Sequence, residues 1–332
     1  MRPIRPTWGE RRKRGEPDVA YQRKLRRLLP LRHQVIDPDV TIDLGQYAAF
    51  PAGYRPSNPS IIRHGDGFLV CVRGVCYRIN ERLNYVTDAD GNVNSLPPLN
   101  RFFLLGNDLN FQRAVPTPQK QLDAVEDLKL FSGLGRAWGV GWTRIDDPRQ
   151  ANACAVTLVE FDPGLTGCRL IPLGSPLGFP IEKNWAPFFV GDVLHFMYSC
   201  EPTILLRCEP ASGALTFVGS RPPRRASLMF LEGGSSGGIA TPSGTIFLTH
   251  RRVVRLPSRR RIYLSRIRHL SRDLTRVAAG PFFSIGHPTI QFANGMLREE
   301  KRILITYGEM DSAARLACIA RGRFERAVFP HQ

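Results

Sequence analysis

The hydrophobic pattern of the chain is that of short β-strands separated by turns. From about Asn58 onward, short apolar runs alternate with turn residues, and long helical periodicity is nearly absent. In the first pair of runs, residues 61–62 and 68–72 flank the sequence HGDG, and an Asp-Gly between two β-rich runs indicates a hairpin. Similar strand pairs follow at residues 128–142, 188–198, 204–217, 239–248 and 303–319. The pattern predicts an all-β fold.

A polar cluster stands directly before an apolar strand at five places: SNPSII at Ser57, VEDLKLF at Val125, EKNWAPFF at Glu182, SGGIATP at Ser236 and GHPTIQF at Gly286. The markers Asn58, Glu126, Lys183, Gly237 and His287 are 68, 57, 54 and 50 residues apart, which is typical of propeller blades. Since inner strands line a central channel, the clusters would converge on one pocket. We therefore predict a five-bladed β-propeller over residues 41–332. A β-sandwich with coincidental spacing is the alternative.

The net charge of +17 is distributed unevenly along the chain. Residues 1–33 contain eleven Arg or Lys and three acidic residues, and residues 251–276 contain ten Arg and one Asp. These two stretches account for the whole net charge, so the rest of the chain is neutral overall. We predict a basic N-terminal tail or accessory segment over residues 1–40, ahead of the propeller.

The two basic stretches suit an anionic partner. They fit peripheral contact with membrane phospholipid, an anionic glycan or a sugar donor, and the alternative is a solvated Arg-rich surface. Because the rest of the chain is neutral, nucleic acid is not an expected partner.

Signals for a membrane span or for secretion are missing. No apolar run reaches the roughly 18 residues of a membrane-spanning helix. The basic N-terminus leads only into residues 28–31, LLPL, which are too short for a signal-peptide core. Seven cysteines form no CxxC pair, and an odd number cannot pair completely within one chain. We expect a cytoplasmic protein, with membrane association through its basic stretches as an option, and neither cofactor nor metal.

Glu126 and Asp127 are adjacent acids directly ahead of the apolar strand 128–131. Because neighbouring strand residues face opposite ways, at most one of them is expected to point into a channel pocket. A carboxyl group in a sugar pocket can act as a general acid if burial or a like charge raises its pKa. The alternative is a turn acid that caps loop amides.

Lys183, Asn184 and Trp185 combine a cation, an amide and a large aromatic ring, which suits a glycan subsite. The alternative is a Trp that packs between blades beside surface polar residues. His250 ends a strand ahead of two arginines, and it is either a member of an anion-binding cluster or a structural histidine.

A final polar corner is predicted in the sequence TYGEMDSAARLA. It contains Tyr307, Asp311 and Arg315, although an Asp and an Arg four residues apart can equally be a simple ion pair. Other catalytic motifs are missing, since there is no GxSxG elbow, P-loop, HExxH or dinucleotide-binding fingerprint. The glycine-rich residues 233–238 lead into a strand and are interpreted as a blade connection.

Taken in order, the segments resemble those of one known group of enzymes. The matching segments are NPSII, GDGFLVCVRGVCYRI, EDLKLF, EKNWAPFF, YSCEP, GGIATPSGTIFLTH, HPTIQFANG and YGEMDSAARLA, and they span about 260 residues. The series is similar to that of the five-bladed propellers of the β-mannoside phosphorylases and hydrolases and the related β-1,2-mannosyltransferases.

This resemblance implies an inverting enzyme in which the Asp of an ED-Pro-Arg segment is the acid, often through a sugar hydroxyl. By resemblance Asp127 takes this role, and Lys183 and His250 fall at positions associated with phosphate or a substrate anion. The remaining expected substrate-binding residues lie in the same segments: Asn58, Arg73, Lys129, Asn184, Trp185, Tyr198, Tyr307, Asp311 and Arg315.

Two positions depart from the phosphorylase pattern. Leu128-Lys129 replaces the Pro-Arg that follows the acid, which keeps a positive charge but loses the bidentate guanidinium. Glu201 stands before Pro202 where the phosphorylases have an Arg, and an acid there would repel phosphate. The changes disfavour phosphorolysis and favour sugar transfer, or hydrolysis with Glu201 as the catalytic base.

We therefore predict an inverting carbohydrate-active enzyme. The first choice is a β-mannosyltransferase-like glycosyltransferase that acts on a surface or storage glycan with a nucleotide-sugar donor. One alternative is a β-mannoside hydrolase or phosphorylase with the same pocket, and another is a non-catalytic glycan-binding propeller.

Overall fold

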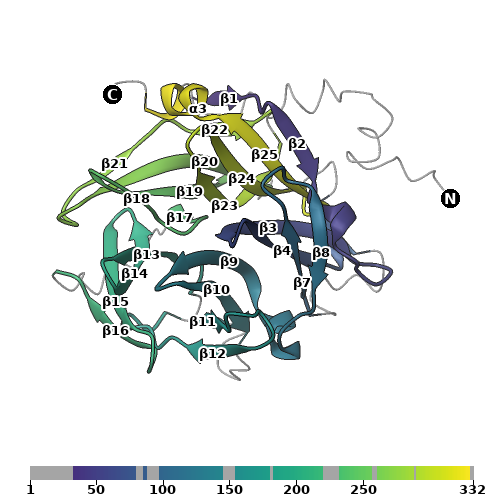
Figure 1. The fold of residues 1–332 in the computed structure, drawn as a ribbon. Helices are drawn as coiled ribbons and strands as arrows, with labels where there is room; N and C mark the ends of the chain where they lie inside the picture. Colours follow the sequence, from purple (N-terminus) through teal and green to yellow (C-terminus); the bar gives the residue numbers. More distant parts are fainter. Residues whose placement is uncertain are drawn as a thin grey trace.

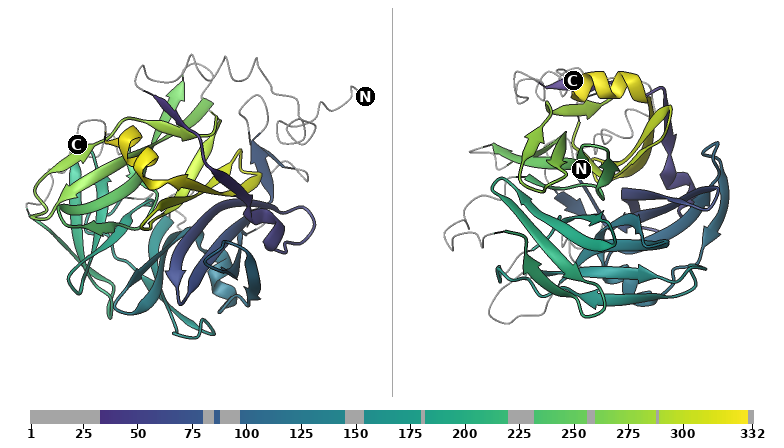
Figure 2. Two further views of the ribbon diagram at one scale, coloured as in Figure 1. Left: turned by 45° about the horizontal axis from the view of Figure 1, so that its top comes forward. Right: turned by 60° about the vertical axis from the view of Figure 1, so that its left-hand side comes forward.

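The computed structural model describes residues 33–79, 85–87, 97–144, 154–179, 182–219, 232–255, 260–287 and 289–329. In this part of the chain, nearly all regular structure is β-strand, and the sheets are arranged around a centre as in a β-propeller (Figure 1). This confirms the predicted all-β propeller. The helix α3 (Arg321–Val328) lies on the outside beside β1 (Gln34–Ile36), as Figure 2 shows. No described helix has the length and hydropathy needed to cross a membrane.

Three regular blades follow one another along the chain, each with four antiparallel strands in sequence order. The first contains β3 (Arg55–His64), β4 (Gly67–Val75), β7 (Leu99–Leu105) and β8 (Phe111–Val115). The second contains β9 (Glu126–Gly133), β10 (Arg136–Arg144), β11 (Cys154–Phe161) and β12 (Cys168–Pro172). The third contains β13 (Ala186–Val190), β14 (Val193–Cys200), β15 (Thr203–Glu209) and β16 (Ala214–Phe217). A small separate sheet pairs β5 (Tyr77–Ile79) with β6 (Tyr85–Thr87).

The fourth regular blade joins the two ends of the described chain. It consists of β23 (Gln291–Arg298), β24 (Arg302–Glu309), β25 (Ala313–Ala320) and β2 (Val40–Asp43). The N-terminal strand β2 pairs antiparallel with β25, with Val40 opposite Cys318. Its backbone hydrogen bonds therefore close the ring and cover what would otherwise be an open edge of β25.

The remaining large sheet has seven strands and does not follow the regular pattern. It contains β17 (Glu232–Gly234), β18 (Ile239–Thr241), β19 (Gly244–Arg255), β20 (Arg260–Ser271), β21 (Val277–Ala279), β22 (Phe283–Ile285) and β1. The structure thus has four regular blades where the sequence predicted five. The physical reason is the length of β19 and β20, 12 residues each, which leaves room for additional short strands along them.

The innermost strands are β3, β9, β13, β17 and β23 (Figure 1). Asn58 lies in β3, Glu126 begins β9 and Lys183 stands just before β13, as their use as markers predicted. Gly237 is displaced, because the inner strand of its sheet is β17 and ends at Gly234. The basic stretch of residues 1–32 lies outside the described residues, and the division of the chain at residue 40 stays a prediction.

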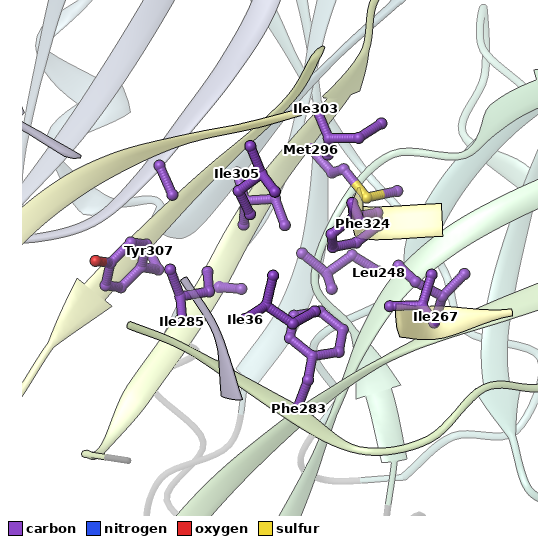
Figure 3. Packing of buried hydrophobic residues seen from close by; sticks show 14 of the residues in the cluster. Ile36, Leu248, Ile267, Phe283, Ile285, Met296, Ile303, Ile305, Tyr307 and Phe324 are labelled. Atoms are coloured by element: carbon purple, nitrogen blue, oxygen red, sulfur yellow. The ribbon is translucent and has the colours of Figure 1, made fainter. Parts of the chain in front are cut away.

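The hydrophobic core is divided among the interfaces between neighbouring sheets. In one interface Ile36, Phe283, Ile305 and Phe324 bring together β1, β22, β24 and α3 (Figure 3). Each of these four side chains is at most 3% exposed. Burying such a side chain contributes about 1.5–3 kcal/mol, so the packed interfaces form a stiff frame around the centre of the ring.

Candidate active site

A cavity of about 750 Å³ lies at the centre of the ring and is lined by residues from all five large sheets. Nine of the predicted site residues line it: Asn58, Arg73, Asp127, Lys183, Asn184, Trp185, Tyr198, His250 and Asp311. Residues separated by up to about 250 positions thus meet in one place, as inner-strand ends of a propeller should. The other four predicted residues, Lys129, Glu201, Tyr307 and Arg315, do not line the cavity.

The strand that carries the two adjacent acids is bulged at this point. Asp127 and Leu128 of β9 stand opposite the single residue Gly141 of β10, and Asp127 has a φ of 51°. Asp and Asn tolerate this left-handed backbone better than most residues, and β3 has a corresponding bulge at Asn58, with a φ of 39°. Since a bulge breaks the alternation of side chains, Glu126 and Asp127 both line the cavity, and the prediction that at most one would do so is wrong.

A buried asparagine ties the two bulges together. Nδ2 of Asn294 donates hydrogen bonds to the carbonyl oxygens of Asn58 and Leu128, both at 3.2 Å. Oγ of Ser60 donates to the same Leu128 carbonyl at 2.8 Å. These bonds satisfy backbone oxygens that the bulges remove from the strand ladders, and they fix the positions from which the Asn58 and Asp127 side chains project.

Asp127 is held by donors from three neighbouring positions. Nδ2 of Asn58 donates to its Oδ1 at 2.8 Å, and Nη1 of Arg73 lies 2.7 Å from the same oxygen. Nε1 of Trp142 donates to Oδ2 at 3.3 Å. The Arg73 guanidinium also pairs with Glu126, so one buried arginine serves both acids.

These contacts decide the protonation state of Asp127. Burial raises the pKa of Asp127. The charges of Arg73, Lys129 and Lys183 and the hydrogen bond from Asn58 together lower it by more than burial raises it, so the pKa lies well below the ordinary value. Asp127 is therefore a carboxylate at neutral pH. The condition that the sequence analysis set for a general acid, a raised pKa, is not met at this residue in the free site.

Asp311 has the opposite environment. It stands in the turn between β24 and β25 with a φ of 46°, and its Oδ1 accepts a hydrogen bond from Oγ of Ser57 at 3.2 Å. Burial raises the pKa of Asp311 to about 6, and the nearby charge of Asp127 acts in the same direction. The charge of Arg73 and the Ser57 hydrogen bond lower the pKa, but by less. Of the two carboxyls, Asp311 is the one that exchanges a proton near neutral pH.

Cationic side chains lie in the same cavity. Nζ of Lys183 lies 5.1 Å from the centre of the Trp142 ring, in a cation–π contact. Lys129 is only 1% exposed and donates to Oδ1 of Asn184 at 3.3 Å, behind the cavity wall. Burial lowers the pKa of Lys129 to about 8, partly offset by the charge of Asp127. Lys129 thus acts on the site through its charge and through Asn184.

Two arginines add positive charge at the cavity lining. Arg144 ends β10, is about half-exposed and pairs with Glu126 at 3.3 Å. Arg252 belongs to β19 and is exposed. With Lys183, these residues supply the positive charge that an anionic substrate group would require.

His250 lines the cavity but is neutral. Burial lowers its pKa to about 3, and the charges of Lys129 and Lys183 lower it as well. Its Nδ1 lies 2.8 Å from Oγ of Ser235, and its ring packs 4.6 Å from that of Phe292. A neutral imidazole can hydrogen-bond a ligand, but it does not add a positive charge to the site.

Trp185 and Tyr198 are more deeply placed than a stacking platform requires. Trp185 is 1% exposed, and its ring packs 5.1 Å from that of Tyr198. The Tyr198 hydroxyl donates to Oε1 of Glu182 at 3.1 Å, and burial raises the pKa of Glu182. Trp142 is more exposed than Trp185 and is the better candidate for a sugar platform.

Glu201 lies away from the cavity lining and is compensated. Its carboxylate is 51% exposed, accepts from Arg266 at 3.0 Å and also pairs with Arg268. The same two arginines enclose the fully buried carboxylate of Glu232. Two arginines of the basic stretch 251–276 are thus neutralised inside the protein, so the stretch is not wholly a surface patch.

Tyr307 and Arg315 also face away from the cavity. Tyr307 is 3% exposed and belongs to the hydrophobic cluster around Ile305 (Figure 3). Nη1 of Arg315 pairs with Asp43 of β2 at 2.8 Å and thereby supports the strand that closes the ring. The predicted polar corner is therefore reduced to Asp311, and the Arg four residues later is not its partner.

Several cavity residues were not among the predicted site residues: Tyr77, Tyr85, Glu126, Trp142, Arg144, Glu182, Glu232, Arg252, Tyr263 and Phe292. The sequence WTR at the end of β10 was the available signal for two of them, since it is a polar-aromatic end of a strand next to the Asp127 strand. Among the described residues, no group of three or more His, Cys, Asp and Glu side chains is placed to hold a metal ion.

Known proteins resemble this chain in structure and not in sequence. No family model matches the sequence, and no curated protein matches it. Among solved structures, a β-1,2-mannobiose phosphorylase from Listeria innocua has a TM-score of 0.55 at 12% identity and covers 87% of this chain and 98% of its own. MPT-4, a mannose phosphorylase from Leishmania mexicana solved with phosphate, has a TM-score of 0.53 at 12% identity, with coverage of 93% and 94%.

A third structure was described for the GH130 family of mannoside phosphorylases, which contains glycoside hydrolases that target β-1,2-mannosidic linkages in Candida mannan. Its TM-score is 0.58 at 13% identity, and the match covers 81% of this chain and 85% of the other. The neighbours are thus GH130-like mannoside phosphorylases and glycosidases. At these identities the likeness establishes the propeller fold, and the activity has to be argued from the site.

Proposed function

We propose that this protein is an inverting carbohydrate-active enzyme that cleaves β-mannosidic bonds with phosphate as the attacking group. The observation that carries the proposal is the composition of the central cavity. It brings the carboxyls Asp127 and Asp311 together with the cations Lys183, Arg144 and Arg252. The mannoside phosphorylases and hydrolases among the structural neighbours support this choice of reaction.

The reaction needs two functions from the cavity. A phosphate oxygen forms a bond to the anomeric carbon as the bond from that carbon to the glycosidic oxygen breaks, which inverts the configuration. The leaving oxygen takes a proton from a carboxylic acid, and the products are mannose 1-phosphate and the shortened sugar. In this proposal the cations bind the phosphate dianion, and the carboxyl groups bind the sugar hydroxyls and transfer the proton.

Phosphate is preferred here to the sugar transfer that the sequence favoured. The sequence argument against phosphate was the acid Glu201, but Glu201 does not line the cavity and is paired with Arg266 and Arg268. Its charge is therefore not directed at a bound anion. None of the three structural neighbours described above is a glycosyltransferase by name, so phosphorolysis or hydrolysis, the earlier alternative, replaces transfer as the main proposal.

Hydrolysis is the second candidate, and Glu182 is the observation that favours it. Glu182 lines the cavity, is 4% exposed and has a pKa raised by burial. A carboxylate with a raised pKa is a better base for activating water than an exposed one. In this version Glu182 replaces Glu201 as the proposed base.

For sugar binding, we propose that Asn58, Arg73 and Asn184 contact hydroxyl groups and that Trp142 packs on the face of a sugar ring. The proposal treats the seven-stranded sheet as the fifth blade of the propeller, because it fills the ring between the third blade and the C-terminal one. The basic residues outside the cavity keep their proposed role as contacts for an anionic surface or glycan.

The test is product analysis with β-1,2-linked mannobiose and longer oligosaccharides, with and without inorganic phosphate. Mannose 1-phosphate formed only with phosphate supports phosphorolysis, and free mannose formed without phosphate supports hydrolysis. Release of a nucleoside diphosphate from nucleotide sugars, without cleavage of mannosides, would overturn the proposal in favour of transfer. Binding of mannosides with no product from any of these mixtures would make the protein a glycan-binding propeller.

A further inference from the structure

A chain of hydrogen bonds links the two carboxyls of the cavity. Nδ2 of Asn58 donates to Oδ1 of Asp127 at 2.8 Å. Oγ of Ser57 lies 3.1 Å from Oδ1 of Asn58 and 3.2 Å from Oδ1 of Asp311. Ser57 is 0% exposed and Asn58 7%, so bulk water does not readily replace either contact.

The number of protons in this hydrogen-bond chain distinguishes its two ends, Asp127 and Asp311. The Ser57 hydroxyl has one proton and two acceptor neighbours, Asn58 Oδ1 and Asp311 Oδ1. If Asp311 is ionised, Ser57 can donate to only one of them. If Asp311 is protonated, it donates to Ser57, Ser57 donates to Asn58 and Asn58 donates to Asp127, so that every contact is a proper hydrogen bond. This hydrogen-bond arrangement favours a proton on Asp311 and a negative charge on Asp127.

The charged groups around Asp311 agree with this assignment. Arg73 pairs directly with Asp127 and Glu126, at the end of the hydrogen-bond chain opposite Asp311. The titratable groups that act on Asp311 from the packed strands are Arg73 of β4 and Asp127 of β9, and Tyr77 of β5 interacts with the same set. Burial raises the pKa of Asp311 to about 6, so its proton is present below that pH and is lost above it.

We propose that Asp311 is the proton donor of the reaction in this cavity and that Asp127 remains a carboxylate that orients the sugar. The inference rests on the proposed function. As the glycosidic bond breaks, the Asp311 hydroxyl turns from Ser57 toward the leaving oxygen, which takes the proton, and Asp311 becomes a carboxylate. The Ser57 hydroxyl then turns its proton from Asn58 to Asp311, and the Arg73 charge stabilises the new anion. Solvent returns the proton after the products leave.

A substrate with an activated leaving group separates the two roles. The leaving group of nitrophenyl β-mannoside departs as a stable phenolate and does not require a proton, whereas the leaving sugar of mannobiose does. For D311N we expect a loss of about 10³-fold in kcat on mannobiose and of less than about tenfold on nitrophenyl mannoside. For D127N we expect comparable losses on both substrates. Asp66→Asn, in the exposed turn between β3 and β4, is the control and should match the wild type.

The proton itself can be followed without turnover. Difference infrared spectroscopy between pH 5 and pH 8 should show a carboxyl group that loses its proton near pH 6 in the wild type and is missing in D311N. In D127N the like charge is gone and Arg73 loses one of its two acidic partners, so the same carboxyl should titrate at lower pH.

Two results would overturn the inference. One is rescue of D127N, and not of D311N, by the activated substrate, which would return the acid role to Asp127. The other is a wild-type spectrum in which no carboxyl that depends on Asp311 titrates between pH 5 and pH 8. If the wild type cleaves neither mannoside, the proposed function fails, whereas the infrared titration still decides where the proton resides.

Discussion

Two buried clusters of acidic and basic side chains lie in the ring, and they differ in how their charges are balanced. In the cavity, Arg73 pairs with both Glu126 and Asp127, and Asp311 adds a further acid. The second cluster is balanced, as described next. Among the described residues no Arg or Lys pairs directly with Asp311, so this carboxyl is free to exchange a proton, and this is where chemistry is expected.

In the balanced cluster, Glu232 is enclosed by Arg266 and Arg268, and Glu201 pairs with both arginines from the rim. Thr249 donates a further hydrogen bond to Glu232 at 2.6 Å. Two positive and two negative charges neutralise each other, and the contacts join the third blade to the seven-stranded sheet. The comparison teaches that an acid near the start of an inner strand, as in Glu126 or Glu232, identifies neither a catalytic nor a structural role until its partners are known.

The largest expected effect is the loss of activity in D127N. The substitution removes the charge that orients the sugar and leaves Arg73 paired with Glu126 alone, so we expect kcat/KM on mannobiose to fall by about 10³-fold. Thermal unfolding should show that the variant remains folded. Wild-type activity in a folded D127N protein would contradict the assignment of the cavity cluster to catalysis.

The matching change in the balanced cluster is Glu232→Gln, which should affect stability. It leaves two buried arginines with only the half-exposed Glu201 as an acidic partner, and we expect a loss of about 3 kcal/mol in the free energy of unfolding. Urea denaturation measures this, with the exposed Glu300→Gln as control. A stability equal to that of the wild type would show that Glu232 does not stabilise the two buried arginines of the seven-stranded sheet.

A smaller effect is expected from Lys183→Ala. The cation lies in the cavity beside Trp142, and its loss should raise the KM for phosphate by about tenfold, which corresponds to about 1.4 kcal/mol. The KM for the mannoside should change less, and Lys301→Ala on the surface is the control. An unchanged KM for phosphate would remove Lys183 from the proposed phosphate site.

The smallest effect should come from Glu201→Gln. Glu201 is half-exposed, so its pairs with Arg266 and Arg268 are screened by solvent and contribute about 0–1 kcal/mol. We expect stability within that range of the wild type and little change in turnover. Loss of hydrolytic activity in a stable E201Q protein would instead restore the sequence prediction that Glu201 is the base.

Much of the fold was accessible from the order of apolar runs and turns, because strands with a buried face leave a local pattern. The closing strand β2 and the strand β1 were not, because they are short and pair with residues far away in sequence, in β25 and β22. Of the predicted site residues, those next to inner-strand starts, such as Asn58, Asp127 and Lys183, do line the cavity. Tyr307 and Arg315 belong to β24 and β25 and not to the inner strand β23, and they contact the core and β2 instead.

The sequence by itself determined which acids and cations this protein carries at its inner strands. Only the tertiary structure decided their pKa values and which of them meet in one cavity. A bulge turned Glu126 and Asp127 toward the same cavity, and Arg73 fixed the charge on Asp127. Burial beside that charge raised the pKa of Asp311 to about 6, because the free energy of an ionised group depends on neighbours that are distant in the chain and close in space.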